Sequence, residues 1–263
     1  MPFIQANDVD IYYKTGGQGP RILFISGTGG DLRIRPNVFD SPLAACREIL
    51  TFDQRGLGQT RAPEVPYSMA DYADDAAALL QALQWQRVAV MGVSFGGMVA
   101  QELGLRHPDL VAKLVLACTS SGGTGGASFP LQELDSLTAD ERFARQLALA
   151  DLRRDEAWRN ANQERWEGLL EMARASRRDD RNIEGAQRQL IARAGHDCWE
   201  RLPELAMPVL LAGGEYDGIA PVANMTAIAQ QVEQAQLRFF AGGHLFLIQD
   251  KTAYPFIIDW LGD

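Results

Sequence analysis

A glycine-flanked serine between a strand-like run and a helix-like run is the feature that most constrains this chain. Residues 88–98 read VAVMGVSFGGM, in which Ser94 lies between Gly92 and Gly96 in the pattern G-x-S-x-G. In such a tight turn, a side chain two positions before or after the serine would clash, and glycine removes that clash. The pattern therefore predicts a nucleophile elbow, with the Ser94 hydroxyl presented above a sheet. The alternative is a glycine-rich turn that only packs against its neighbours and has no catalytic role.

The rest of the chain alternates buried strands with helices. Short apolar runs bounded by Gly, Asp or Ser are typical of strands buried on both faces, and they lie at 22–25, 49–52, 88–91, 114–117, 209–212 and 237–240. Helical patterns lie at 69–83, 95–105, 221–232 and 254–261. Polar and apolar residues alternate loosely over 3–13, which predicts an antiparallel edge hairpin. We predict an α/β fold with a mostly parallel, eight-stranded sheet flanked by helices.

Residues 122–200 interrupt this alternation. A glycine cluster at 122–126 is followed by charged, amphipathic patterns without a strand-like run, and these patterns predict three or four helices. We therefore predict a core made of residues 1–121 and 201–263, and a helical cap, or lid, made of residues 122–200. The alternative is a helical layer without a function of its own.

Composition limits the partners and the cellular compartment. Acidic residues number 34 against 25 basic ones, a net charge of −9 that disfavours binding to nucleic acid or anionic lipid. Cys46, Cys118 and Cys198 form no CxxC pair, which disfavours a disulfide framework or a zinc site. Cys118 lies in an apolar run and is expected to be a buried, inert thiol. Without a signal peptide or a membrane-length apolar run, we expect a cytoplasmic protein.

Histidine is scarce, and a serine hydroxyl needs a base before it acts as a nucleophile. The candidates are His107, His196 and His244. His107 precedes a proline at the predicted end of the helix after the elbow, and His196 lies near the end of the segment 122–200, before the next strand. His244 lies in a glycine loop after the last strand-like run, from which an imidazole can reach Ser94. We therefore prefer His244 and keep the other two as weaker candidates.

The acid that orients the imidazole is expected in the turn after the preceding strand. Asp217 lies in that turn, and its alternative role is to cap the helix that starts near Pro221. Glu215 is the closest rival. Asp197 lies beside His196, but adjacent residues need not bond to each other, and Asp197 is expected to cap the segment 198–202.

An oxyanion hole needs two N–H donors near the nucleophile. One is expected from Phe95, directly after Ser94, at the positive end of a helix. The other is expected from the loop 26–31, where we choose Thr28 and keep Gly29 as the alternative. This loop contains neither GxxxxGK[ST] nor the spacing GxGxxG, so a nucleotide site is disfavoured.

The inserted segment 122–200 is expected to supply walls of the substrate pocket. The candidate substrate-binding residues are Gly29, Trp158, Trp166 and Phe246, with Phe143 and Met172 as further candidates. Equally, the helical spacing of the aromatic residues can serve only to pack the cap on the sheet. Arg33 and Arg35 follow the oxyanion loop and can bind an acidic substrate group, although a solvated surface role is favoured for both.

With these motifs in place, the chain resembles the serine branch of the α/β-hydrolase superfamily over nearly its full length. The resemblance lies in the loop at Gly27, the elbow at Ser94, the turn at Asp217, and His244. Residues 52–60, FDQRGLGQT, are similar to the family's D-x-R-G-x-G-x-S turn, but end in Thr rather than Ser.

Two details bear on this resemblance. In the 52–60 turn, Arg55 is expected to tie loops together near the site. The oxyanion loop has Ser26-Gly27 where the family often has His-Gly, so the exact geometry of the loop is open. Within the serine branch, the chain is similar to 3-oxoadipate enol-lactonase-like hydrolases and to carboxylesterases.

The resemblance implies an α/β-hydrolase fold and a serine hydrolase of small esters or lactones. Ser94, His244 and Asp217 would form its catalytic triad, with no metal and no organic cofactor. Carbon–carbon bond hydrolases and cofactor-free perhydrolases share the same motifs, and hydrolase-like ligand receptors also keep the triad. The expected partner is a small-molecule ester or lactone, and the oligomeric state is open, with a homodimer as one option.

Overall fold

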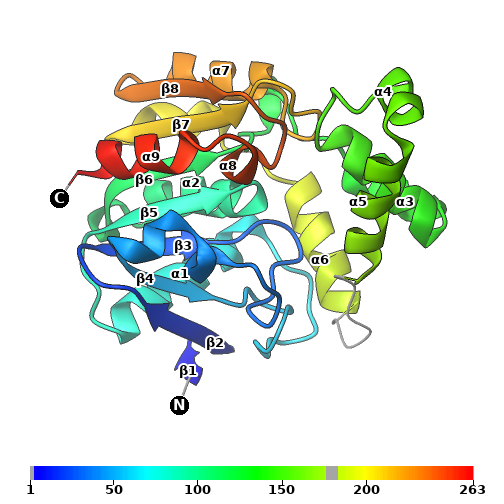
Figure 1. Cartoon of the computed structure of the whole chain (residues 1–263). Helices are drawn as coiled ribbons and strands as arrows, with labels where there is room; N and C mark the ends of the chain where they lie inside the picture. Colours follow the sequence, from blue (N-terminus) through cyan, green and yellow to red (C-terminus); the bar gives the residue numbers. More distant parts are fainter. Residues whose placement is uncertain (1–2, 176–182, 263) are drawn as a thin grey trace.

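The computed structural model describes residues 3–175 and 183–262, which form an eight-stranded sheet with helices around it (Figure 1). The strand order is β1-β2-β4-β3-β5-β6-β7-β8; β2 pairs antiparallel with β1 and β4, and the other pairs are parallel. The strands are β1 (Phe3–Ala6), β2 (Val9–Gly16), β3 (Arg21–Ile25), β4 (Glu48–Phe52), β5 (Val88–Val93), β6 (Val111–Ala117), β7 (Val209–Gly214) and β8 (Ala235–Phe240). The predicted mostly parallel, eight-stranded sheet with an antiparallel edge hairpin is confirmed.

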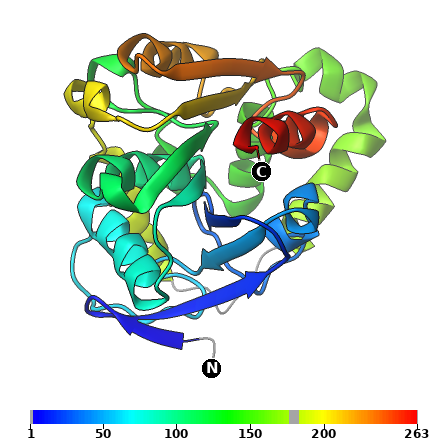
Figure 2. The same ribbon diagram turned by 90° about the vertical axis from the view of Figure 1, so that its left-hand side faces the viewer.

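Helices cover both faces of this sheet, and Figure 2 shows α1 and α2 on one face and α9 on the other. The helices of the predicted core are α1 (Met69–Ala82), α2 (Phe95–Arg106), α7 (Val222–Gln231), α8 (Phe246–Gln249) and α9 (Ala253–Leu261). Helix α1 begins after Ser68, whose side chain accepts the N–H of Asp71 while the Asp71 carboxylate accepts the N–H of Ser68. Within residues 3–175 and 183–262, no helix is both long and apolar enough to span a membrane.

Neighbouring side chains of the central strands are buried on opposite faces of the sheet. In β3, Leu23 and Ile25 belong to the apolar cluster shared with α1 and α2, whereas Ile22 belongs to the cluster shared with α9. In β6, Leu114 and Val115 are divided in the same way. Side chains alternate across a strand, so a strand covered on both faces has a continuous apolar run instead of a polar–apolar alternation.

Between β6 and β7 the described chain forms helices instead of strands. They are α3 (Ala139–Leu149), α4 (Glu156–Ala161), α5 (Gln163–Ala175) and α6 (Ile183–Ala194). In Figure 1, α3, α4 and α5 group to one side of the sheet, and α6 lies between them and the rest of the fold. Helix α6 approaches the loop after β4 closely, because a Cβ at Gly185 would lie 1.8 Å from the carbonyl oxygen of Gly56.

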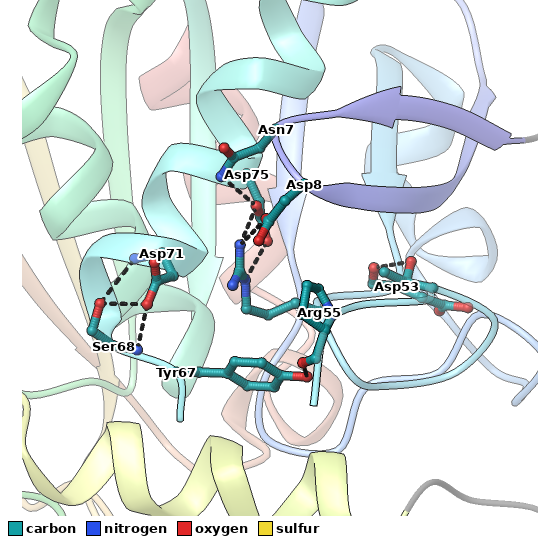
Figure 3. Close-up of polar contacts among 10 residues, drawn as sticks. Asn7, Asp8, Asp53, Arg55, Tyr67, Ser68, Asp71 and Asp75 are labelled. Atoms are coloured by element: carbon teal, nitrogen blue, oxygen red, sulfur yellow. Dashed lines mark hydrogen bonds and ion pairs between the residues drawn. The ribbon is translucent and has the colours of Figure 1, made fainter. Parts of the chain in front are cut away.

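A buried ion pair fixes the loop after β4 to α1 (Figure 3). Arg55 donates from Nε to Asp75 Oδ2 at 2.6 Å and from Nη2 to Oδ1 at 2.7 Å, and both side chains are almost fully buried. The guanidinium carbon lies 5.2 Å from the centre of the Tyr67 ring. In the same loop, the Asp53 carboxylate accepts the N–H of Leu32 from the segment after β3 at 2.7 Å. The loop-tying role expected of Arg55 agrees with these contacts.

Replacing Arg55 with methionine is expected to lower the free energy of unfolding by about 3–5 kcal/mol, because the Asp75 carboxylate would stay buried without a counter-charge, with only the Asn7 amide left to donate to it. Arg106→Met is the matched control. Arg106 makes the same two-bond contact with Asp74, but the two side chains are 37% and 34% exposed, so its loss should cost at most about 1 kcal/mol. Urea denaturation followed by circular dichroism measures both. Equal losses of unfolding free energy in the two variants would contradict the explanation that burial makes the Arg55–Asp75 pair more important.

Candidate active site

Ser94 lies at the turn between β5 and α2 in a strained backbone conformation. Its φ is 56° and its ψ is −117°, a region that residues with side chains rarely adopt. A Cβ at Gly92 would lie 2.1 Å from the Gly96 carbonyl oxygen, and a Cβ at Gly96 would lie 2.1 Å from the Ile25 carbonyl oxygen. Only glycine fits at either position, so the two glycines of the motif are what permits the turn that carries Ser94.

Side chains from three loops meet at this turn. His244 Nε2 lies 3.0 Å from Ser94 Oγ, and His244 Nδ1 lies 2.7 Å from Asp217 Oδ2. The other Asp217 oxygen accepts the N–H groups of Ile219 and Ala220 at 2.8 and 2.9 Å. These two bonds orient the carboxylate toward the imidazole. The structure thus brings together the three residues that the sequence analysis selects as nucleophile, base and acid.

The surroundings of His244 favour its protonated form. Burial alone would lower the pKa of His244, but interactions with Cys118 and with the Asp217 carboxylate outweigh burial and raise this pKa above its usual value. The carboxylate acts by stabilising the imidazolium, and its side chain is fully shielded from solvent. An imidazole held in this way is well suited to accept the proton of the Ser94 hydroxyl.

Cys118 lies beside Asp217 and His244, a position that the sequence did not predict. Its burial agrees with the expectation for this thiol, but β6 ends at Ala117, and Cys118 follows it with a φ of 41°. Its Sγ, a carboxylate oxygen of Asp217 and a ring nitrogen of His244 all lie within 4.8 Å of one another. Parallel neighbouring strands end at the same edge of a sheet. The position of Cys118 directly after β6 is therefore the signal that could have placed it here.

The inserted segment holds both loops that carry the candidate base and acid. The N–H of His244 donates to the Ala150 carbonyl oxygen at 2.6 Å, and the N–H of Gly218 donates to the Leu149 carbonyl oxygen at 2.9 Å. A Cβ at Gly243 would lie 2.0 Å from the same Ala150 oxygen. These are backbone contacts, which leave no residue-type pattern, so the sequence analysis had no signal for them.

The two backbone N–H groups predicted to form the oxyanion hole have no partner among the described residues. Within residues 3–175 and 183–262, neither the N–H of Phe95 nor the N–H of Thr28 has a hydrogen-bond acceptor. The N–H of Gly29, by contrast, donates to Gln189 Oε1 on α6 at 2.8 Å. Of the two oxyanion-loop donors that the sequence analysis considers, Thr28 is therefore the one left available.

A largely apolar cavity of about 680 Å³ opens beside His244. It lies on the sheet face that carries α9, and Gly27 and Gly29 of the oxyanion loop line part of it. Its apolar walls include Phe24, Leu32, Ile34, Val93, Leu247 and Ile248. The size and the apolar lining are typical of a site for a small ligand.

The family of the chain follows from a comparison with known proteins. The family model described as alpha/beta hydrolase fold matches residues 20–251, a range that contains Ser94, Asp217 and His244. The chain belongs to the alpha/beta hydrolase fold family. The predicted resemblance to this superfamily is confirmed.

Individual relatives span nearly the whole of this hydrolase-fold chain. It is 30% identical over 244 residues to the poly(3-hydroxyalkanoate) depolymerase of Ectopseudomonas oleovorans, covering 91% of this chain and 83% of the relative. It is 22% identical over 263 residues to 3-oxoadipate enol-lactonase 2 of Acinetobacter baylyi, covering 97% and 94%. The enol-lactonase structure from Burkholderia xenovorans superposes with a TM-score of 0.81 at 23% identity over all of both chains, which shows a shared fold.

Trp158 and Trp166 do not line the cavity beside His244, and neither does any other described residue of the inserted segment. The two tryptophans stack instead on arginine side chains, with Arg165 at 5.6 Å from the centre of the Trp158 ring and Arg159 at 5.5 Å from that of Trp166. Met172 is largely exposed. The cavity therefore does not have the walls that the sequence analysis expects from the inserted segment.

Phe246 also lies away from the cavity, in contrast to the prediction. It is fully buried and stacks on Phe240, with ring centres 5.3 Å apart. Helix α8 begins at Phe246 and turns its side chain into the core, whereas Leu245 and Leu247 on either side line the cavity. Gly29, another candidate substrate-binding residue, lines the cavity.

The other two histidines of this alpha/beta hydrolase make no contact with Ser94 within hydrogen-bond distance. His107 follows the last residue of α2, and its Nε2 lies 2.7 Å from Asp74 Oδ1. His196 is buried with its Nε2 3.7 Å from Cys198 Sγ, and burial lowers the pKa of His196 to about 4. Geometry therefore favours His244 as the base.

The rival acids also lie elsewhere. Glu215 is exposed, whereas Asp217 is buried against His244. Asp197 accepts the N–H of Trp199 at 3.1 Å, at the start of the helical turn 199–204, as expected of a capping residue.

Arg33 and Arg35 are both engaged in ion pairs. Arg33 pairs with Asp31 at 2.7 Å, and Arg35 pairs with Asp40. Arg35 is largely exposed, in agreement with the surface role favoured for it, whereas Arg33 is half-buried and pairs with a buried carboxylate.

Proposed function

We propose that this chain is a serine hydrolase that cleaves carboxylic ester or lactone bonds of small substrates through an acyl-enzyme. The observation that carries the proposal is the line of hydrogen bonds from Ser94 Oγ to His244 at 3.0 Å and from His244 to Asp217 at 2.7 Å, at a nucleophile elbow. The names of two relatives, an enol-lactonase and a poly(3-hydroxyalkanoate) depolymerase, support this class of bond.

The first half of the reaction forms the acyl-enzyme. Ser94 Oγ attacks the carbonyl carbon while His244 Nε2 accepts the hydroxyl proton. The N–H groups of Phe95 and Thr28 donate to the oxyanion that forms, and Asp217 stabilises the imidazolium. His244 then gives its proton to the leaving alkoxide oxygen as the carbon–oxygen bond breaks, and the acyl group stays on Ser94.

The second half of the reaction releases the acid. A water molecule gives a proton to His244 and attacks the acyl carbon, and the same two N–H groups stabilise the second oxyanion. The carbon–Oγ bond then breaks, and His244 returns the proton to Ser94. Every group in this cycle belongs to the chain or to the substrate, so the proposed chemistry needs no metal and no organic cofactor.

In the proposed enzyme, residues 1–121 and 201–263 form the core and residues 122–200 form the cap. The N–H groups of His244, Gly218 and Gly29 all donate hydrogen bonds to oxygens of the cap, and these bonds support a cap that braces the site. The cavity beside His244 would hold an apolar group of the substrate. The core would therefore determine which apolar group of the substrate binds. The cap would hold the oxyanion loop in place through the hydrogen bond from the Gly29 N–H to Gln189.

Purified protein and a panel of 4-nitrophenyl esters, aliphatic lactones and thioesters test the proposal. At least one ester or lactone is expected to give kcat/KM in the ordinary enzyme range, about 10⁴ M⁻¹s⁻¹ or more. Absence of ester and lactone turnover would overturn the proposal. Cleavage of a 1,5-diketone or peracid formation from hydrogen peroxide would then assign carbon–carbon hydrolysis or perhydrolysis, and stoichiometric binding with few turnovers would assign a receptor.

A further inference from the structure

The loop 241–244, which carries His244, is held by a side chain as well as by the cap backbone. The N–H of Gly243 donates to Gln249 Oε1 at 2.7 Å. The next N–H along the chain, that of His244, donates to the Ala150 carbonyl oxygen. Gln249 is the last residue of the short helix α8, which begins two residues after His244. Two successive N–H groups of this loop, which we call the base loop, are therefore bonded to groups outside it.

The side chain of Asp151 determines which way the Gln249 amide points. Asp151 lies two residues after the end of α3, and its side chain is almost fully buried. Gln249 Nε2 donates to Asp151 Oδ2 at 3.0 Å. An ionised carboxylate only accepts hydrogen bonds, so the NH2 group of Gln249 has to face Asp151. The amide oxygen then faces Gly243, where it accepts the N–H of the base loop.

Arg153 keeps this carboxylate ionised and connects it to the turn of the candidate acid. Arg153 Nε donates to Asp151 Oδ1 at 2.8 Å, and Nη2 donates to Oδ2 at 2.7 Å. Burial would raise the pKa of Asp151, but the hydrogen bonds and the charge of Arg153 outweigh burial and hold this pKa below its usual value. The guanidinium carbon lies 4.7 Å from the centre of the Tyr216 ring, and Tyr216 directly precedes Asp217. Asp151 therefore has contacts toward both loops that carry the candidate base and acid.

We propose that Asp151 is a positioning residue that acts through Gln249 on the geometry of the base loop. It holds Nε2 of His244 within hydrogen-bond distance of Ser94 Oγ, and this proposal rests on the proposed serine hydrolase. A displacement of about 1 Å at a reacting group can lower a rate by roughly 100-fold. Neither Asp151 nor Gln249 lines the cavity beside His244. We therefore expect the pair to affect kcat and to leave KM nearly unchanged.

An exchange of the two polar partners tests the proposal. Gln249→Glu places two carboxylates against each other and is expected to lower kcat for a 4-nitrophenyl ester by roughly 10–100-fold. The double variant, Asp151→Asn with Gln249→Glu, again has one donor and one acceptor. Its asparagine amide can donate to the introduced carboxylate, which still accepts the N–H of Gly243. The double variant should recover kcat to within about threefold of the wild-type value, as expected of two side chains in direct contact.

Two further variants complete this comparison. Asp151→Asn alone should lower kcat only by roughly three- to tenfold, because the asparagine oxygen can still accept the Gln249 N–H. Gln236→Glu is the matched control, since it introduces the same carboxylate at an exposed position of β8, and its kcat and KM should equal those of the wild-type chain.

Several results would overturn the positioning role. One is a double variant whose loss equals the product of the two single losses, because the two side chains would then act independently. A loss in KM alone, or no loss in Gln249→Glu, would overturn it as well. If Gln249→Glu did not fold, the double variant would be compared with Asp151→Asn. A higher kcat in the double variant would support the pair, and an equal or lower one would contradict it.

Hydrogen exchange examines the base loop without a substrate and so separates this proposal from the proposed function. In mass spectrometry of the peptide 241–249, Gln249→Glu is expected to exchange its amide hydrogens faster than the wild-type chain, and the double variant should return to the wild-type rate. Unchanged exchange in Gln249→Glu would overturn the positioning role even in an active enzyme. The expected exchange without ester turnover in any chain would contradict only the proposed hydrolase, and would still support the hold of Asp151 on the base loop.

Discussion

Replacing Ser94 with alanine is expected to abolish ester hydrolysis, lowering kcat by roughly 10⁵–10⁶-fold. The variant loses the oxygen that lies 3.0 Å from His244 Nε2, so no acyl-enzyme can form, and only direct attack by water remains. The backbone at this position, with φ at 56°, is no harder for alanine to adopt than for serine. Release of 4-nitrophenol measures the activity, and thermal melting shows that the fold persists.

Ser136→Ala is the control for this experiment, because Ser136 is a serine of the inserted segment whose hydroxyl donates to the Glu133 carbonyl oxygen at 3.5 Å. It should keep full activity. A fluorophosphonate should add one adduct mass to the wild-type chain and none to Ser94→Ala. If Ser94→Ala hydrolysed esters at close to the wild-type rate, another residue would have to be the nucleophile.

Replacing Asp217 with asparagine is expected to lower kcat by about 10⁴-fold, since asparagine neither holds the required imidazole tautomer nor stabilises the imidazolium. The base acts only when His244 is neutral, so activity falls as the pH drops through the pKa of His244. The Asp217 carboxylate and Cys118 both raise this pKa against the effect of burial, so removing the carboxylate lowers the pKa of His244 while the interaction with Cys118 remains. The acid limb of the pH profile of kcat/KM should therefore move to lower pH in the variant.

The pH profile of kcat/KM measures this shift, because it reports the free enzyme. Glu215→Gln is the matched control: it removes a carboxylate two residues away, but Glu215 is exposed, so both the rate and the profile should stay close to those of the wild-type chain. A shift of the acid limb to higher pH in Asp217→Asn, or a similar rate loss in Glu215→Gln, would contradict the assigned role of Asp217.

Much of the candidate site could be predicted from the sequence because the relevant constraints are local. The glycines on either side of Ser94 are required by backbone oxygens about 2 Å from where their Cβ atoms would lie. The continuous apolar runs indicated a sheet covered on both faces, and the parallel order placed the turns of Asp217 and His244 at one edge of it. With only three histidines in the chain, the choice of a base was narrow.

The predictions that were wrong concern which part of the protein a side chain contacts. Trp158 and Trp166 have helical spacing, but spacing identifies a face of a helix and not its neighbour, and both rings stack on arginines. Phe246 follows His244 directly, yet the start of α8 turns it into the core. Adjacent residues on a helix point in different directions, so proximity in sequence to the base does not predict proximity to the cavity.

The sequence by itself determined the parts of this protein that depend on a few neighbouring residues: the strands and helices, the elbow at Ser94, and the identity of the candidate acid and base. Only the tertiary structure decided the rest. It set the hydrogen bond that the His244 N–H donates to the Ala150 carbonyl oxygen, the cavity beside His244, and the stacking of Trp158 and Trp166 on arginine side chains. These features arise from contacts between different segments of the fold. Each contact depends on which groups of another segment pack nearby, and no pattern along the chain records this.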